Sequence, residues 1–308
     1  MEETKIYCPD IECGSCIKLM DRRLSKINGV EKISFNKDSL DVTYNKELVS
    51  PHQISDSIRQ LGFRADFVPF SRKTFKERWR DFKENKIKYE IEYKMLKYSF
   101  YALILLAALE LGAFFLFFRN NQLIGKNLLW IFYLDLAVVS IGAAIWHLNS
   151  YRGDATTMIG MMVGMTFGMQ TGLMIGTIIG ATNGMFTGTM AGMLFGVAVG
   201  WLNGKCCGIM GILEGAMAGV MSGTMGAMIG VMLSIDRILV FMPFFMAINL
   251  IIMWGFSYML FEETVEGNPK IEKKKISFLN LFLYCFIALV LLVLIIIYAP
   301  RSGIASVI

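Results

Sequence analysis

The stretch MIGMMVGMTFGMQTG, residues 158–172, places glycine at every fourth position and methionine in most of the intervals. Glycine keeps this interval from Gly160 to Gly208 and continues in steps of three or four residues from Gly211 to Gly230. Hydrocarbon does not draw apolar helices together, so membrane helices associate where small residues let their backbones approach. The stripe therefore predicts closely packed membrane helices. Because its period exceeds the 3.6 residues of a helical turn, we expect their contact line to wind right-handedly.

The chain as a whole has the composition of a membrane protein. Of its 308 residues, 55% are hydrophobic, which is high for a single soluble domain. The turn signals ATNG and NGKCCG divide the glycine-rich region 156–233 into three segments. We expect seven membrane-spanning helices, near 98–118, 128–148, 156–180, 184–202, 208–233, 238–261 and 277–299. A six-span arrangement with a re-entrant segment is the alternative, because the middle segment of the glycine-rich region is short.

Lysine and arginine predict the orientation. Segment 71–97 carries ten of them against five acids, and a second basic segment follows at 262–275. Seven spans place both segments on one side of the membrane, which the positive-inside rule makes cytoplasmic. We therefore expect a multi-pass cell-membrane protein with a cytoplasmic N-terminal domain. The cytoplasm keeps thiols reduced, so the six cysteines are expected to be free thiols or metal ligands.

Three parts are expected along the chain: a head at 1–70, a basic linker helix at 71–97 and a membrane domain at 98–308. The linker is expected to lie near lipid headgroups. Within the head, residues 3–69 alternate between strand and helix patterns in the order βαββαβ. Ser50-Pro51 is an N-cap followed by proline at the first helical position, and it opens the second helix. The fold class is therefore an α+β head joined to an all-α membrane domain.

Cys13 and Cys16 stand between the first strand and the first helix of the head. Two thiols at this spacing can converge on one ion, and the helix N-terminus favours their thiolate form. Thiolates are soft ligands that select Cu(I) and also suit Zn, Cd or Hg. From the spacing alone, a thioredoxin-like redox pair and half a zinc knuckle remain alternatives.

The head resembles the heavy-metal-associated domain of copper metallochaperones and metal pumps. The resemblance rests on C-x-x-C at Cys13 and Cys16, INGV at 27–30 and SPHQISDSIRQLGF at 50–63. It implies a ferredoxin-like fold and metal binding by the two cysteines. That family usually has Gly-Met-Thr before the first cysteine, and the preferred metal stays open because this chain has Asp10, Ile11 and Glu12 there.

Fifteen of the 22 methionines lie between Met158 and Met232. A spacing of four residues aligns two sets of them on one helix face each: Met161, Met165 and Met169, and Met217, Met221 and Met225. Thioether sulfur is a weak, soft ligand, and a row of weak sites lets an ion enter and still leave. The combination with G-x-x-x-G is similar to that of eukaryotic copper uptake proteins. Methionine as a flexible filler beside glycine is the alternative interpretation.

Cys206 and Cys207 add two thiols in a loop predicted to be cytoplasmic. Thiolates there could pass an ion between the head and the membrane domain; palmitoylation or a merely structural role is the alternative. Glu214 is an acid inside a span, where such residues are costly and face polar interiors, so it could balance the charge of a passing cation. Glu110 and Asp135 lie within spans in the same way.

These patterns predict a transporter or channel-like relay for a soft metal ion, most of all Cu(I). The sequence lacks an aspartyl-phosphorylation motif and a phosphate-binding loop, so no enzymatic activity is expected. The expected partners are the metal ion, the lipid bilayer, a cytosolic metallochaperone and further copies of the chain, and nucleic acid is not among them. A membrane-tethered metal buffer or sensor and a mercuric-ion transporter are the alternative functions.

Overall fold

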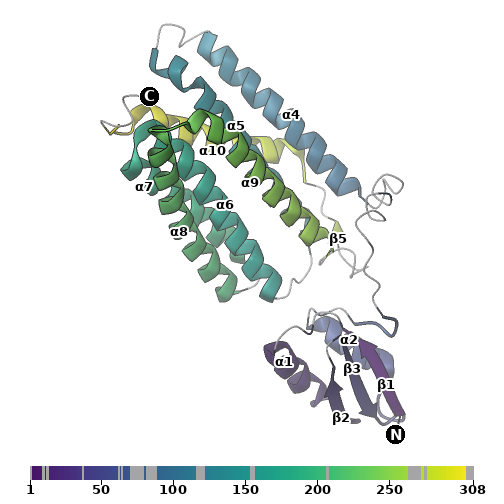
Figure 1. The fold of residues 1–308 in the computed structure, drawn as a ribbon. Coiled ribbons are helices and arrows are strands. Elements are labelled where there is room, and N and C mark those ends of the chain that lie inside the picture. Colours follow the sequence, from purple (N-terminus) through teal and green to yellow (C-terminus); the bar gives the residue numbers. More distant parts are fainter. Residues whose placement is uncertain are drawn as a thin grey trace. The chain divides into compact units, whose positions relative to one another are not determined.

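The structure is a computed structural model and divides the chain into two compact units, Met1–Asn85 and Lys86–Ile308. A three-stranded sheet belongs to the first unit and the long helices belong to the second (Figure 1). The described residues are 2–8, 11, 14–36, 38–61, 63, 65–69, 80, 89–115, 122–152, 157–205, 208–262, 272–273 and 276–302. Much of the predicted linker at 71–97 thus lies outside the described residues.

The N-terminal unit is a small antiparallel sheet with two helices. Strands β1 (Glu2–Tyr7), β3 (Ser39–Tyr44) and β2 (Val30–Phe35) lie in this order across the sheet. Helix α1 (Gly14–Leu24) follows β1, and α2 (Pro51–Gln60) follows β3. Both connections cross the sheet, as the predicted α+β class requires.

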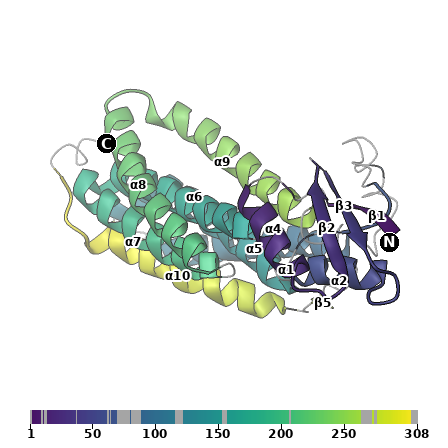
Figure 2. The same ribbon diagram turned by 90° about the horizontal axis from the view of Figure 1, so that it is seen from below.

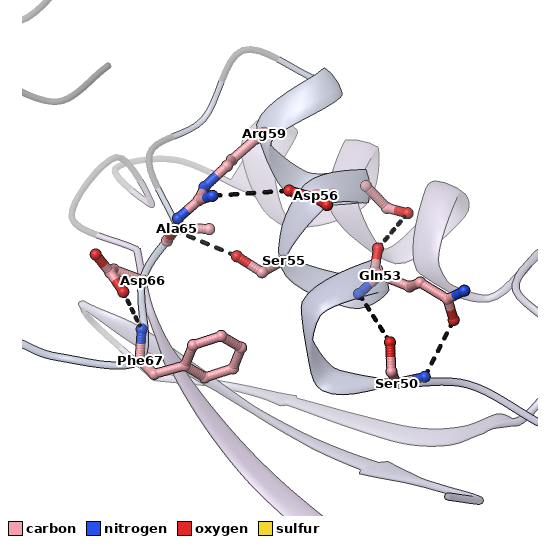
Figure 3. Close-up of polar contacts among 9 residues, drawn as sticks. Ser50, Gln53, Ser55, Asp56, Arg59, Ala65, Asp66 and Phe67 are labelled. Carbon is pink, nitrogen blue, oxygen red and sulfur yellow. Dashed lines mark hydrogen bonds and ion pairs between the residues drawn. The ribbon is translucent and has the colours of Figure 1, made fainter. Parts of the chain in front are cut away.

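The predicted final strand of this unit is reduced to a single β-bridge. Tyr7 and Asp66 exchange both backbone hydrogen bonds, at 2.7 and 3.0 Å between nitrogen and oxygen. From α2, Ser55 Oγ and Arg59 Nε donate to the carbonyl oxygen of Ala65 at 3.3 and 3.0 Å (Figure 3). These bonds hold the last segment beside β1, so the order βαββαβ is confirmed with its sixth element shortened.

Helix α2 begins where the sequence predicts. Ser50 Oγ accepts from the backbone nitrogen of Gln53, and Gln53 Oε1 accepts from the backbone nitrogen of Ser50 at 3.1 Å (Figure 3). This capping box satisfies N–H groups that a helix start leaves unpaired. One face of the helix is buried through Ile54 and Ile58. They pack in a core with Ile6, Met20, Leu24, Leu40 and Val42.

The second unit contains, in its described part, seven helices, each with a segment of 20 to 26 residues that is long and apolar enough to cross a membrane. This confirms the predicted number of spans. Their bounds are α4 (Glu90–Ala113), α5 (Gln122–Ser150), α6 (Thr157–Asn183), α7 (Met185–Gly204), α8 (Ile209–Ser234), α9 (Ile238–Leu260) and α10 (Phe278–Tyr298). Helix α7, where the six-span alternative had a re-entrant segment, is continuous over 20 residues.

Contacts at the two ends of the bundle show that successive helices alternate in direction. At one end, the ring of Tyr89 before α4 stacks on Phe261 after α9, with centroids 4.8 Å apart. Strand β4 (Tyr151–Arg152) pairs there with β5 (Glu272–Lys273). At the other end, the backbone nitrogen of Ser302 donates to the end of α6 at 2.9 Å. The chain therefore enters α4 and α10 from the same end.

Helices α6, α7 and α8, here called the glycine trio, lie side by side and pack backbone to backbone (Figures 1 and 2). A Cβ atom built on Gly164 would lie within 3.0 Å of the carbonyl oxygen of Gly211 and 3.3 Å from Gly204 Cα. Successive levels of contact lie four residues apart along α7. They join Gly168, Gly200 and Gly215; then Gly196 and Gly219; then Gly176, Gly192 and Gly223; and last Gly180, Gly188 and Ala227.

The four-residue repeat explains the register of the trio. The chain reverses between α6 and α7 at Gly184, whose φ of 104° is a conformation open to glycine. Since the repeat runs without a break on both sides of this turn, antiparallel pairing brings glycine opposite glycine at each level. A step of three residues from Gly208 to Gly211 keeps this match across the next turn, where Gly204 meets Gly211.

The remaining helices use large side chains instead. Phe167 of α6 meets Phe256 of α9 edge to face, with centroids 5.1 Å apart. Tyr98 of α4 meets Trp146 of α5 in the same way at 5.6 Å. The buried core of the unit is centred on α5, through side chains such as Leu134 and Val139.

Candidate functional site

The predicted metal-binding loop of the head lies between β1 and α1. Cys16 lies in the first turn of α1, which begins at Gly14, while Cys13 lies outside the described residues. A helix N-terminus carries partial positive charge that stabilises a thiolate. On the β1 side of the loop, Cys8 and Ile11 are buried in the core. Cys8 is thus a core residue, and Cys16 is the cysteine that the fold places at the helix start.

Residues 6–64, which include this loop, match the family model described as the heavy-metal-associated domain. The N-terminal unit carries a heavy-metal-associated domain. Copper-transporting ATPase 1 of Rattus norvegicus is 34% identical to the chain over 55 residues, which cover 17% of this chain and 4% of that protein. No solved structure matches the chain. The predicted resemblance is confirmed for this domain, and the helical unit is not assigned to a family.

The methionine ladders lie on the outside of the glycine trio. In α8, the exposed fractions of Met217, Met221 and Met225 are 55%, 61% and 47%. In α6, Met165 is 43% exposed, and its neighbours Met161 and Met169 are partly exposed. Glycine occupies the opposite, inner face of these helices. The interior of the trio is filled by backbone, so the sulfur atoms line its outer surface and no passage inside it.

Glu214 belongs to the same outer face of α8. At about 100° per residue, Glu214, Met217, Met221 and Met225 fall within about 60° of one line along the helix. Glu214 is half-buried. Lys205, which precedes the predicted thiol pair, is exposed, whereas Cys206 and Cys207 lie outside the described residues. The structure therefore joins an acid to the α8 ladder and leaves the thiol pair as a prediction.

A polar cluster lies at the bundle end where the chain enters α4. The His147 side chain is fully buried on α5, and its Nε2 lies 3.4 Å from Glu92 Oε1 of α4. The hydroxyl of Tyr151 donates to the same Glu92 oxygen. Burial, followed by the negative charge of Glu92, raises the pKa of the Tyr151 phenol. The phenol therefore stays protonated and acts as a hydrogen-bond donor.

No role was predicted for this cluster from the sequence. His147 and Tyr151 are spaced by four residues, which places them on one face at the end of a predicted span. That spacing is a signal for a shared partner. The partner, Glu92, lies 55 residues earlier, in a segment interpreted as linker. Only the pairing of α4 with α5 brings them together.

A second polar group lies deeper in the same pair of helices. Asp135 of α5 is fully buried, and the carboxyl groups of Asp135 and Glu110 contact each other. Cys285 of α10 is also buried, and its thiol donates to the carbonyl oxygen of Val138 at 3.9 Å. Both acids were noted in the sequence as charged residues within spans, but a contact between them was not predicted.

No group of three or more histidine, cysteine, aspartate or glutamate side chains that could hold a metal ion is found within the part of the chain that the structure describes. Cys13, Cys206 and Cys207 lie outside that part. The described donors for a soft ion include the exposed methionine sulfurs on the surface of the trio, the buried sulfurs of Met174, Met242, Met246 and Met253, and the buried thiol of Cys285. A hard-metal centre built from carboxylates and imidazole is not offered by the described helices.

Proposed function

We propose that the protein handles a soft metal ion at a membrane and moves it between the heavy-metal-associated domain and the helical unit, with Cu(I) as the preferred ion. The observation that carries this proposal is a heavy-metal-associated domain, with Cys13 and Cys16, on one chain with seven apolar helices rich in methionine. Thiolate and thioether are both soft sulfur ligands that suit Cu(I). The head faces the cytoplasm in this proposal, where a metallochaperone can load it, and the protein has no catalytic role.

The position of the methionines decides what kind of path this proposal requires. Because the interior of the trio is closed, an ion that follows the α8 ladder must move along its outer face. We place a second copy of the chain against this face, so that Met217, Met221 and Met225 line a path between two copies. Glu214 on the same face supports this arrangement, since an acid exposed to hydrocarbon costs about 2.5–3.5 kcal/mol or more.

A membrane-tethered metal buffer or sensor is the second candidate. The closed trio with its sulfur atoms outside favours this function, because a tether needs no passage. In it, Cys13 and Cys16 bind the ion and the helices only anchor the domain. Zn, Cd or Hg bound by the same cysteines would change the cargo of either candidate, and mercuric-ion transport is the third.

Proteoliposomes that enclose a Cu(I)-responsive dye test the proposal with the full chain. We expect dye signal from the native protein and none above protein-free liposomes from Cys13→Ser/Cys16→Ser or from Met217→Leu/Met221→Leu/Met225→Leu. The matched control is Met185→Leu/Met190→Leu on α7, where the side chains are 51% and 57% exposed. This variant should conduct normally.

Separate outcomes decide between the candidates. Stoichiometric Cu(I) on the head without flux selects the tethered buffer and rejects transport. Equal flux in the ladder and control variants rejects the intersubunit path. Parallel titrations with Zn, Cd and Hg rank the ions. If the purified protein binds none of the four at Cys13 and Cys16, soft-metal handling itself is refuted.

A further inference from the structure

Helices α4 and α5 bring two acids together inside the membrane unit. Asp135 has no exposed surface, and among the described residues no hydrogen-bond donor reaches either of its carboxyl oxygens or Glu110 Oε1. The two carboxyl groups nevertheless contact each other. Since a carboxylate can only accept hydrogen bonds, two carboxylates cannot hydrogen-bond to each other unless one of them carries a proton.

The position of the pair within the membrane strengthens the case for a proton. Asp135 lies twelve residues from His147 along α5, or about 18 Å at 1.5 Å per residue. His147 belongs to the polar cluster at the bundle end, so Asp135 lies near the middle of a hydrocarbon core about 30 Å thick. Two like charges in contact at that depth repel strongly, and a shared proton removes the repulsion. A carboxyl pair elsewhere in proteins ionises in two separate steps for the same reason.

Among the described residues, no lysine, arginine or histidine acts on either carboxyl group. Helix α5 packs against α4, α6, α9 and α10. Over their described side chains near the pair, the titratable group that faces Asp135 is the thiol of Cys285, which is neutral or negative. A metal ion would need further ligands, and the described residues form no group of three that could hold one. A proton is therefore the cation that fits.

We propose that Glu110 and Asp135 bind one shared proton and that this pair is the proton-binding site of the membrane unit. Helix α4 packs chiefly against α5, with a smaller contact to α10. A shift of α4 along α5 would separate the carboxyl groups and release the proton to the side that opens. In this way the pair would couple proton movement to ion movement, a role that rests on the proposed function, whereas proton binding does not.

Infrared difference spectroscopy of the metal-free full-length protein in lipid nanodiscs tests proton binding directly. We expect the native protein to show, at neutral pH, a protonated-carboxyl band that shifts in D₂O. Glu110→Gln and Asp135→Asn should each shift this band, because the remaining buried carboxyl keeps the proton without its partner, and the two substitutions together should remove it. Asp236→Asn, at the exposed turn after α8, is the control and should leave it unchanged. A native protein without such a band, or a band that survives both substitutions, would overturn the proposal.

Two further measurements keep the proposal testable if one variant fails to fold. Glu110 is only half-buried, so Glu110→Gln keeps the test informative if Asp135→Asn fails to fold. In proteoliposomes with an imposed pH gradient, metal flux through the native protein should respond to the gradient, and flux through Glu110→Gln should not. Flux that responds equally in both overturns the coupling role. A carboxyl band without any metal flux upholds the proton site and refutes transport.

Discussion

A methyl group added to Gly200 in the glycine trio would lie within 3.0 Å of the backbone of Gly215, whereas one added to Gly255 of α9 would meet nothing within 4 Å. The trio is thus held by backbone contact at every fourth residue. The outer helices α4, α5, α9 and α10 are held by aromatic and aliphatic side chains, and they contain the pair Glu110–Asp135 and the cluster around His147.

This difference indicates that the inner face of the trio has a structural role, whereas the groups with possible chemical roles lie between the outer helices and on the outer face of α8. The trio carries its sulfur on the outside and has no room inside for an ion. The outer helices leave larger spaces between backbones, which large apolar side chains fill together with a few polar ones such as Asp135 and His147. If both assignments are right, changes inside the trio should act on folding, changes between α4 and α5 on protonation, and changes on the outer face of α8 on metal alone.

The largest effect is expected from Gly200→Ala. Its Cβ would press on the Gly215 backbone and lie 3.1 Å from Gly168 Cα, and a helix backbone cannot move aside as a side chain can. We expect a loss of about 2–3 kcal/mol, at the upper end of overpacking effects. Thermal unfolding in detergent micelles measures it.

Gly255→Ala is the matched control for this substitution. It adds the same atom to the interior of a membrane helix, where space is open. Alanine has a higher helix propensity than glycine by about 1 kcal/mol, so this variant should be as stable as the native protein or more stable. Equal losses in the two variants would show that the trio is no tighter than its surroundings.

The next effect is expected at the junction of the trio with α10. Asn183 Nδ2 donates to the carbonyl oxygens of Ile296 and Ala299, each at 3.2 Å. Asn183→Ala removes both bonds and leaves the Ile296 carbonyl with only the longer bond from Arg301 Nη2 at 3.4 Å, so a cost of about 1–3 kcal/mol is expected. Asn203→Ala is the control, because its amide donates to Val199 of the same helix at 2.8 Å, and it should cost less than about 1 kcal/mol. The same unfolding assay compares them, and no difference would show that the junction adds nothing to stability.

Much of the fold followed from periodicity. The repeat of glycine and the lengths of the apolar runs predicted seven spans, and the structure contains them. Helix α4 begins at Glu90, before the predicted span at 98–118, because charged residues of the predicted linker helix continue into the same helix. The shortening of the last strand of the head to the Tyr7–Asp66 bridge could not be predicted either, since a short alternating segment shows how side chains face and not how many backbone pairs form.

Less of the candidate site than of the fold could be predicted from the sequence. C-x-x-C at the start of a helix predicts a metal-binding loop, because both its spacing and its place in the chain are local, and residues 6–64 around it match the heavy-metal-associated domain. The outward position of the methionines was not predicted, since the glycines and methionines of one helix compete for the inner face and only packing decides which of them occupies it. The contact of Glu110 with Asp135 depends on how α4 and α5 align, and no local pattern encodes that.

A smaller effect is expected from Tyr151→Phe. The variant keeps the ring beside His147, with centroids 5.2 Å apart in the native protein, and removes the hydroxyl that donates to Glu92. Hydrogen bonds of membrane helices contribute about 0.6 kcal/mol on average, so a loss near 1 kcal/mol or below is expected. A double-mutant cycle with Glu92→Gln isolates this bond, and Tyr298→Phe, 80% exposed, is the control. Additive losses would show that the hydroxyl and Glu92 are not coupled.

The smallest effect on stability is expected from Met217→Leu/Met221→Leu/Met225→Leu. Leucine has a similar volume and the three side chains are about half exposed, so the change in unfolding free energy should stay within about 0.5 kcal/mol. The sulfur atoms of the ladder are lost, however, and with them three of the soft ligands on this face. Unchanged unfolding together with lost Cu(I) flux would therefore assign the ladder to metal and not to packing. If the variant instead unfolds as readily as Gly200→Ala, the outer face of α8 is part of the packed structure. The glycine trio would then not have a structural inner face and a metal-binding outer face.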